Sequence, residues 1–478
     1  MIASKTLEGA IAVTRFGLGA KPGELADAAN DPRGWLKAQI TRDGAEQPQG
    51  SLPGSVARLS DLVAYRDEIA PLRKERKQAS ATVAMTGQDQ AMDEVDQFKK
   101  ERRTALQRLL EGVRDEIFAR TRLATSTSQP FRERWTLFWA NHFTVSTAKL
   151  QSSVLVGPFE REAVRPHVFG RFEDMLVASS MHPGMLMYLD QAKSAGPDSP
   201  AGLYKKMGLN ENLAREIMEL HTVGADAGYT QADVTEFARA LTGYSVGGAK
   251  NDAPDVQGHF LYRPALHEPG TRTVMGRRYD QAGEDQARAV VADLAASPKT
   301  AEHLARKLAV HFVADEPPSA LVARLRESYL TSRGDLAHVA TTLIDAQECW
   351  APEPRKFKTP YEFVVSGYRA AGANPSDPAK DVVQPLTFLG QRPFSAPQPN
   401  GWSDVAADWT APDALIKRLT WASKFSAYYA PKDGAPVDVA AATLGDRLTM
   451  AAKTAIARAE TRFEAFSILL MSPEFQRR

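Results

Sequence analysis

The stretch from Asn210 to Gly243, NENLAREIMELHTVGADAGYTQADVTEFARALTG, constrains the fold of this chain more than any other. Its apolar residues recur at helical spacing on both sides of a glycine-rich turn that begins at Gly224. Thr230 and Asp233 supply a capping box for the second segment. The stretch therefore predicts two helices joined by a turn, and we expect this pair to line a functional cleft.

The rest of the chain predicts the same fold class, an all-α multi-helix bundle. Residues 56–123 are rich in Ala, Leu, Arg, Lys and Glu and predict two long helices, connected within residues 79–92. Residues 244–280 carry Gly, Pro, Tyr and His instead, which predicts a small irregular or β insertion with strands near 258–262 and 271–275 that form a hairpin. We divide the chain into N-terminal helices and loops (1–55), a long helical pair (56–123) and a main helical domain (124–478), which together form one compact unit.

Composition narrows the range of functions. The net charge of +1 favours neither nucleic acid nor an acidic membrane surface. Cys349 is the single cysteine, so an intramolecular disulfide and a cysteine-only metal site are excluded. No run approaches the roughly 20 apolar residues of a membrane span. Glu8 and Arg15 interrupt the apolar N-terminus, which is a poor secretory signal. We expect a cytoplasmic protein.

The first helix of the central stretch has two chemically different faces. Leu213, Ile217 and Leu220 form an apolar stripe. A second face, about a third of the helical wheel, collects four polar side chains, those of Asn212, Arg215, Glu216 and Glu219. His221 lies nearly opposite these carboxylates, so E-x-x-E-x-H cannot hold one ion on an ideal helix. Two interpretations stay open: a solvated ion-pair network, or a carboxylate pair in a cleft that a distant histidine completes.

Two histidines and one tryptophan are the distant candidates. His142 shares a helical face with Trp135, Phe138 and Trp139, which is more typical of a core histidine than of a ligand. His267 lies in a loop, where histidines are better ligands or acid–base groups. His311 shares an apolar stripe and is interpreted as core. Trp402 ends a proline-rich run that either walls a pocket or braces the core.

The motifs together resemble the bacterial domain-of-unknown-function family eighteen hundred. Besides the central stretch, similar segments occur along nearly the whole chain: Arg15–Gly19, Phe138–Phe143, His267–Gly270, Leu304–Phe312, Lys358–Val364 and Pro399–Trp402. Glu268 stands where Asp is usual in that family. The resemblance implies a mainly helical fold. Many members are exported, so it also implies the periplasm as an alternative location. It carries over no catalytic residue.

The leading functional hypothesis is a metal-dependent enzyme, a hydrolase or an oxidoreductase, acting on an unknown small molecule. His142, Glu216, Glu219 and His267 would bind a divalent metal ion, with Glu216 and His267 also catalytic. Asn212, Arg215 and Trp402 would bind substrate. The alternative is a non-catalytic helical binding or assembly module that acts with a partner protein, through the charged face of residues 93–120 or the loop before Trp402.

Overall fold

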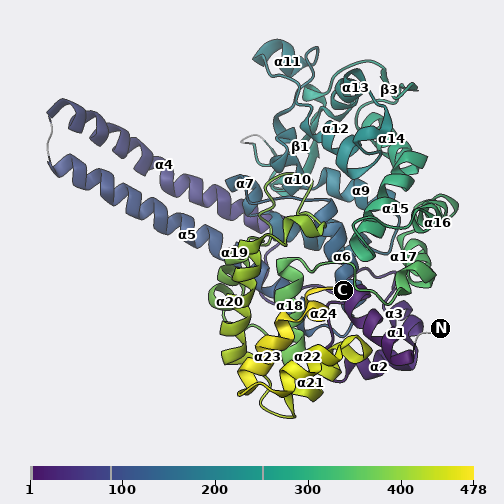
Figure 1. The fold of residues 1–478 in the computed structure, drawn as a ribbon. Coiled ribbons are helices and arrows are strands. Elements are labelled where there is room, and N and C mark those ends of the chain that lie inside the picture. The colour runs from purple at the N-terminus through teal and green to yellow at the C-terminus, as the bar shows by residue number, and fades with distance from the viewer. Residues whose placement is uncertain (1–3, 87–88, 250–251) are drawn as a thin grey trace.

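In the computed structural model the chain folds into a helical body from which one long helical hairpin projects (Figure 1). The structure describes residues 4–86, 89–249 and 252–478, with only the backbone described for 75–86 and 89–94. Helices account for 65% of the chain and strands for 4%, which confirms the all-α class.

The N-terminal segment consists of short helices around a turn, as predicted. Helix α1 (Lys5–Ile11) continues into the π-helical turn η1 (Ala12–Phe16), and α2 (Glu24–Asn30) and α3 (Pro32–Lys37) follow the turn. Ser4 caps α1 and Asp31 caps α3, each by accepting a backbone N–H. This segment packs into the core of the body through Ile11, Val13 and Phe16, which are fully buried.

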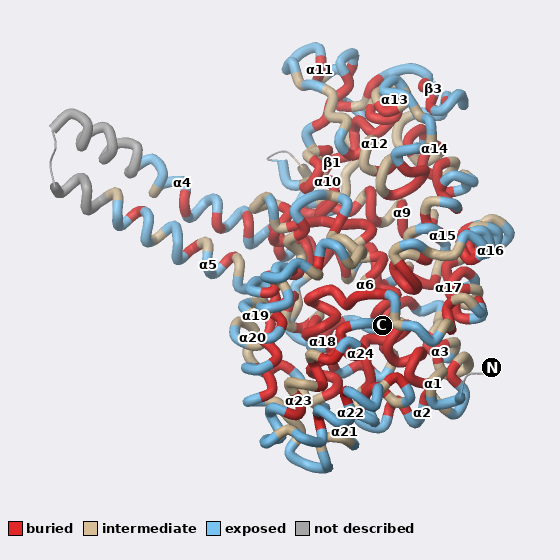
Figure 2. Tube along the Cα trace, viewed as in Figure 1, coloured by how far each residue is buried: buried red, intermediate tan, exposed pale blue. Residues whose placement is uncertain are grey.

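The two predicted long helices form the projecting hairpin. They are α4 (Ser55–Thr86) and α5 (Asp89–Ser126), so helix extends further into residues 79–92 than expected, and residues 87–88 lie outside the described part. Where the hairpin joins the body its helices pack through apolar side chains that include Leu62, Ile69 and Leu109. Further from the body, most of the hairpin residues that the structure describes are exposed (Figure 2). Our division of the chain at residues 55 and 123 stays a prediction.

The main body begins with α6 (Pro130–His142), whose aromatic face anchors the core. Phe131 and Trp135 of this helix meet Phe312 of α15 (Pro298–Phe312), with ring centroids 6.2 and 6.0 Å apart. Phe16 lies 6.1 Å from Phe131. Such clusters of large rings bury much apolar area and fix the orientation of the helices that carry them.

The central element is a helix pair, but its first helix is shorter and less regular than predicted. Helix α12 (Asn212–Glu216) becomes the π-helical turn η5 (Ile217–His221), and α13 (Gln231–Leu241) starts at the predicted capping box. The wider turn changes the buried face, which contains Met218 and His221 while Leu220 is only half-buried. The predicted stripe was therefore wrong at Leu220, because a π-helical turn departs from the 3.6-residue period.

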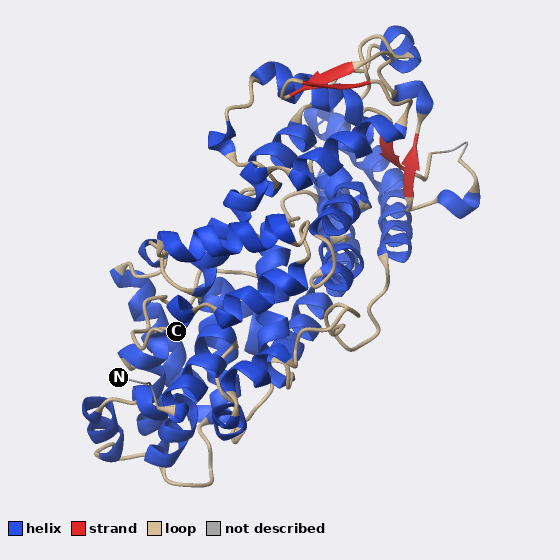
Figure 3. Cartoon of the chain, turned by 90° about the vertical axis from the view of Figure 1, so that its right-hand side faces the viewer, coloured by secondary structure: helices blue, strands red, loops and turns tan. Residues whose placement is uncertain are grey.

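The insertion at 244–280 holds two separate two-stranded sheets instead of one hairpin. Strand β1 (Tyr244–Val246) pairs with β2 (Phe260–Tyr262), and β3 (Arg272–Val274) pairs with β4 (Arg277–Tyr279), both antiparallel. The two predicted strands exist as β2 and β3, but each pairs with a strand that the pattern did not indicate. Figure 3 shows both sheets at the end of the molecule opposite the two termini.

The remaining helices complete the body. Their bounds are α7 (Leu150–Ser153), α8 (Val156–Phe159), α9 (Phe172–Met181), α10 (Pro183–Tyr188), α11 (Pro200–Lys205), α14 (Glu284–Ala296), α16 (Ser319–Thr331), α17 (Leu336–Asp345), α18 (Pro360–Ala371), α19 (Gln384–Phe388), α20 (Pro412–Tyr429), α21 (Pro436–Leu444), α22 (Met450–Ala457), α23 (Arg462–Met471) and α24 (Pro473–Gln476).

No helix in the described ranges combines the length and the apolar character that a bilayer crossing requires.

Candidate functional site

A pocket opens where α6, α15 and the first turn of α18 meet the loop at residues 391–404. It encloses about 810 Å³ of unfilled space, part of it continuous with solvent. Its walls are largely apolar, with a few charged groups among them. The lining comprises Leu18, Arg120, Arg134, Leu137, Ala140, Asn141, Thr144, Val145, His311, Thr359, Tyr361, Glu362, Gln391, Pro393, Phe394, Ala396, Trp402, Ser403 and Asp404. Apolar walls with few convergent polar groups are typical of small-molecule sites.

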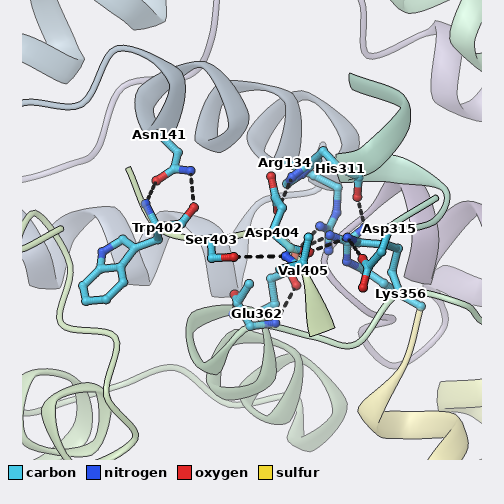
Figure 4. A network of polar contacts seen from close by, with 12 residues as sticks. Arg134, Asn141, His311, Asp315, Lys356, Glu362, Trp402, Ser403, Asp404 and Val405 are labelled. Atoms are coloured by element: carbon cyan, nitrogen blue, oxygen red, sulfur yellow. Dashed lines mark hydrogen bonds and ion pairs between the residues drawn. The ribbon is translucent and has the colours of Figure 1, made fainter. Parts of the chain in front are cut away.

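Asn141 holds the loop that carries Trp402. Its side-chain Nδ2 donates to the carbonyl oxygen of Trp402 (2.9 Å), and its Oδ1 accepts the backbone N–H of the same residue (2.8 Å; Figure 4). Gly401 makes this approach possible, because its φ is +82° and a Cβ there would lie 2.5 Å from the Asn141 carbonyl oxygen. The indole of Trp402 is thereby placed in the pocket wall, and its buried Nε1–H has no partner among the described residues.

His311 and Asp404 form a hydrogen-bonded pair in the same wall. His311 Nδ1 lies 2.8 Å from Asp404 Oδ1. Burial opposes ionisation of Asp404, but His311 and Lys356 outweigh it and hold its pKa at about 2. Burial lowers the pKa of His311 although Asp404 raises it, so the imidazole is neutral at pH 7. Since a carboxylate can only accept, Nδ1 carries the proton and Nε2 carries the lone pair. Nε2 is buried and has no partner in the described part of the chain.

The backbone around Asp404 is fixed from the opposite side. Lys356 Nζ donates to the Asp404 carbonyl oxygen and to Asp315 Oδ1 (2.5 Å). Asp315 Oδ2 in turn accepts the backbone N–H of Ala406 (2.8 Å). The loop is therefore held at Trp402 and again at residues 404–406, which limits the movement of the carboxylate between them.

Beside this pair lies a buried carboxylate with two guanidinium partners. Glu362 forms ion pairs with Arg134 and with Arg478 (3.0 Å), and its other oxygen accepts the Thr359 N–H in the capping box of α18. Burial works against ionisation of Glu362, but the two arginines hold its pKa well below the usual range. This group contributes a fixed charge distribution to the pocket wall and ties α6 to α18.

A second titratable cluster adjoins the pair along α15. His142 donates from Nε2 to the His221 carbonyl oxygen (3.1 Å), and its Nδ1 lies 3.0 Å from Lys307 Nζ, one helical turn from His311. His303 lies against the Leu220 carbonyl (3.2 Å). Burial, with Lys307 as the next cause, lowers the pKa of His142 well below its usual value, and burial lowers that of Lys307 to about 8. His142 is thus a core histidine with satisfied nitrogens, as its helical face indicated.

Glu216 and Glu219 do lie close enough to repel each other. Burial, and then the Glu219 charge, raises the pKa of Glu216 to about 7. Glu219 accepts a hydrogen bond from Tyr229 (3.3 Å). His221 of the same element faces inward, its ring 5.9 Å from that of His142, which agrees with its predicted position away from the carboxylates.

The other predicted site residues have different partners. His267 Nδ1 donates to the Thr242 carbonyl oxygen (2.9 Å). Arg215 bonds Glu211 (3.2 Å) and Gln231 (2.9 Å), and Asn212 is exposed. Within the described ranges, no group of three or more His, Cys, Asp or Glu side chains is placed to hold a metal ion. The four metal ligands expected from the sequence are therefore not brought together as one set.

Of the residues predicted from the sequence, Trp402 lines the pocket. Sequence reasoning missed His311 as a functional residue and did not consider Asp404. The apolar stripe of α15 correctly placed His311 inside, but its partner lies 93 residues away in a loop without regular spacing. The signal that was present is the proline-rich run up to Trp402, because Asp404 follows it directly.

The comparisons with known proteins identify a family and assign no reaction to it. No curated protein and no solved structure matches the chain. One family model, described as a protein of unknown function (DUF1800), matches residues 11–477. The matched range contains the pocket, the central helix pair and the projecting hairpin. The chain therefore belongs to the DUF1800 family.

Proposed function

We propose that this protein is an enzyme that uses general acid–base chemistry to hydrolyse a small molecule bound in the pocket beside Trp402. The observation that carries the proposal is His311, a neutral imidazole whose Nδ1–H is held by Asp404 and whose buried Nε2 lone pair has no partner among the residues that the structure describes. A histidine oriented by a carboxylate is the arrangement that enzymes use to remove a proton from water or a hydroxyl. Asp404 would fix the tautomer and stabilise the imidazolium.

The pocket walls support a substrate with a flat apolar part and a polar reacting group. Phe394 and Trp402 supply aromatic surface, and the indole N–H of Trp402, which has no partner in the described part of the chain, would donate to a substrate oxygen. Arg134 is bound by Glu362, so it would contribute orientation more than free charge. Together these groups favour an uncharged substrate, an ester or an amide, over a phosphoester.

The test is a hydrolase panel of aryl esters, anilides and aryl phosphates with wild type, His311→Gln and, as a control, His338→Gln. His338 is exposed on α17. We expect ester or amide turnover that falls by roughly 100-fold or more in His311→Gln and is unchanged in His338→Gln. The rate should stay constant as the pH falls through 6.5 and decline only at lower pH, because burial lowers the pKa of His311 below its ordinary value. Absence of turnover in the wild type, or full activity in His311→Gln, would contradict the proposal.

A divalent metal ion at Glu216 and Glu219 is the second candidate. The observation in its favour is the raised pKa of Glu216, since a cation between two crowded carboxylates relieves their repulsion. Two carboxylates with water would suit Mg²⁺ or Mn²⁺. Calorimetry with Mn²⁺ should show one site that disappears in Glu216→Gln/Glu219→Gln and persists in Glu302→Gln, which changes an exposed glutamate. Equal binding to all three proteins would reject this site.

The projecting hairpin supports the non-catalytic alternative, a binding module. It extends away from the body and exposes Val63, an apolar side chain 51% accessible. A photo-crosslinker placed at Val63 should then capture one defined protein from cells. Capture no greater than from a crosslinker at Tyr428, which is exposed on α20, would exclude this role.

A further inference from the structure

A second pocket lies between the C-terminal helices and the N-terminal segment. Residues of α1, α22 and α24, which are labelled in Figure 1, contribute to its lining. It encloses about 1490 Å³ of unfilled space, much of it open to solvent, and shares no lining residue with the pocket beside Trp402. The lining comprises Leu7, Pro352, Pro354, Asp446, Arg447, Thr449, Ala451, Ala452, Ala455, Ile468, Met471, Ser472, Pro473, Glu474 and Arg477. Most of these side chains are apolar.

Arg447 is the exception that gives this pocket a chemical preference. Its side chain is buried, with only 7% of the residue exposed. Nη1 donates to Thr14 Oγ1 (2.5 Å), whereas Nε and Nη2 are buried without a hydrogen-bond partner in the described ranges. Nε–H and Nη2–H are the two parallel donors on one edge of a guanidinium, the edge that binds both oxygens of a carboxylate.

The surroundings leave the charge of Arg447 uncompensated. The described residues place no carboxylate within ion-pair distance of it, although Asp446 and Glu474 are part of the pocket lining. Burial, and then the nearby Arg15 guanidinium, lowers the pKa of Arg447 to about 9, so it remains cationic at pH 7. Arg15 itself bonds two backbone carbonyls, of Cys349 and Glu353, and brings no negative charge. A buried cation without a counter-ion is costly unless a ligand supplies one.

We propose that this pocket binds an apolar molecule with a single carboxylate, such as a medium-chain fatty acid. The carboxylate engages Nε and Nη2 of Arg447, and the chain lies along Leu7, Ile468 and Met471. Asp446 and Glu474 favour a singly charged group over a phosphate dianion, because their repulsion of an anion increases with its charge. The site is independent of the reaction at His311.

Calorimetry with decanoate, below its micelle concentration, tests the proposal. The variants are Arg447→Gln and, as a matched control, Arg477→Gln, which removes an exposed arginine of the same pocket. We expect one decanoate per chain, a loss of at least about tenfold in affinity in Arg447→Gln and less than about twofold in Arg477→Gln. Decyl phosphate and 1-decanol should each bind about tenfold more weakly than decanoate, and Arg447→Gln should not alter the binding of 1-decanol.

With these ligands and variants, each of the following outcomes would overturn the proposal: no binding of decanoate, equal affinity in wild type and Arg447→Gln, or tighter binding of decyl phosphate than of decanoate. Because the described residues leave Arg447 without a carboxylate partner, Arg447→Gln is expected to fold. Ala451→Trp provides an independent variant, since Ala451 is exposed in the lining and an indole there fills the pocket while Arg447 is unchanged. It should also abolish decanoate binding, and undiminished binding would equally refute the site.

Discussion

Replacing Asn141 by Ala tests whether the loop that carries Trp402 is held by side-chain hydrogen bonds. The substitution removes two bonds to one residue, 2.9 Å to the Trp402 carbonyl oxygen and 2.8 Å from its N–H. At about 0.5–1.5 kcal/mol net for each bond, the free energy of unfolding should fall by about 1–3 kcal/mol. Equilibrium urea unfolding followed by circular dichroism measures this difference, and limited proteolysis reports whether residues 391–404 have become accessible.

Asn212→Ala is the matched control, because Asn212 is exposed on α12 and a surface change of this kind costs within about 0.5 kcal/mol. Gly401→Ala approaches the same contact from the other side. It combines a φ of +82° with a Cβ 2.5 Å from the Asn141 carbonyl oxygen, so we expect at least about 1 kcal/mol of destabilisation. If Asn141→Ala costs no more than Asn212→Ala and leaves the loop resistant to protease, the loop is held by something else.

Three further predictions concern other buried groups. Folding raises the pKa of Glu216 from 4.5 to about 7, so the folded state binds more protons between these pH values and the free energy of unfolding falls as the pH rises through them. Urea unfolding at several pH values in this range should show that Glu216→Gln reduces the slope of this free energy against pH, and an unchanged slope would contradict the assignment. Glu362→Gln leaves Arg134 and Arg478 without their buried carboxylate and should cost about 3–5 kcal/mol in the same assay, whereas a loss below about 1 kcal/mol would mean that water compensates. Cys349 is fully buried and its pKa is raised to about 12 by burial, so a thiol reagent at pH 8 should modify it only after unfolding; prompt reaction of the native protein would disprove its burial.

Local sequence signals predicted the secondary structure best where a cap and an apolar period coincided. The capping box Thr230–Asp233 starts α13 at the expected residue. The prediction failed at Leu220, where the chain adopts a π-helical turn, and in the insertion, where pairing partners decide which short segments become strands. In both places tertiary contacts outweigh a weak local preference.

The candidate site was predictable only in part, and for a definable reason. A helical wheel placed His142 and His311 inside the body, because burial follows from the position of a residue on one helix. A helical wheel gives no information about which residues of other elements pack against the buried face. His142 faces Lys307 from another helix, and His311 faces Asp404 from a loop, so neither meets the carboxylates of Glu216 and Glu219 that the sequence analysis joined to His142.

The sequence by itself determined the all-α class, the start of α13 at its capping box and the orientation of Glu216 and Glu219 away from His221. These properties depend on periodicity and capping, which act over a few residues. Only the tertiary structure decided which polar groups share a pocket. For this reason the pairing of His311 with Asp404 was not foreseen, nor was the guanidinium edge of Arg447 that the described residues leave without a partner. Contacts between distant segments form because many apolar side chains pack together at once, and no short pattern encodes which buried polar atoms that packing brings within hydrogen-bond distance.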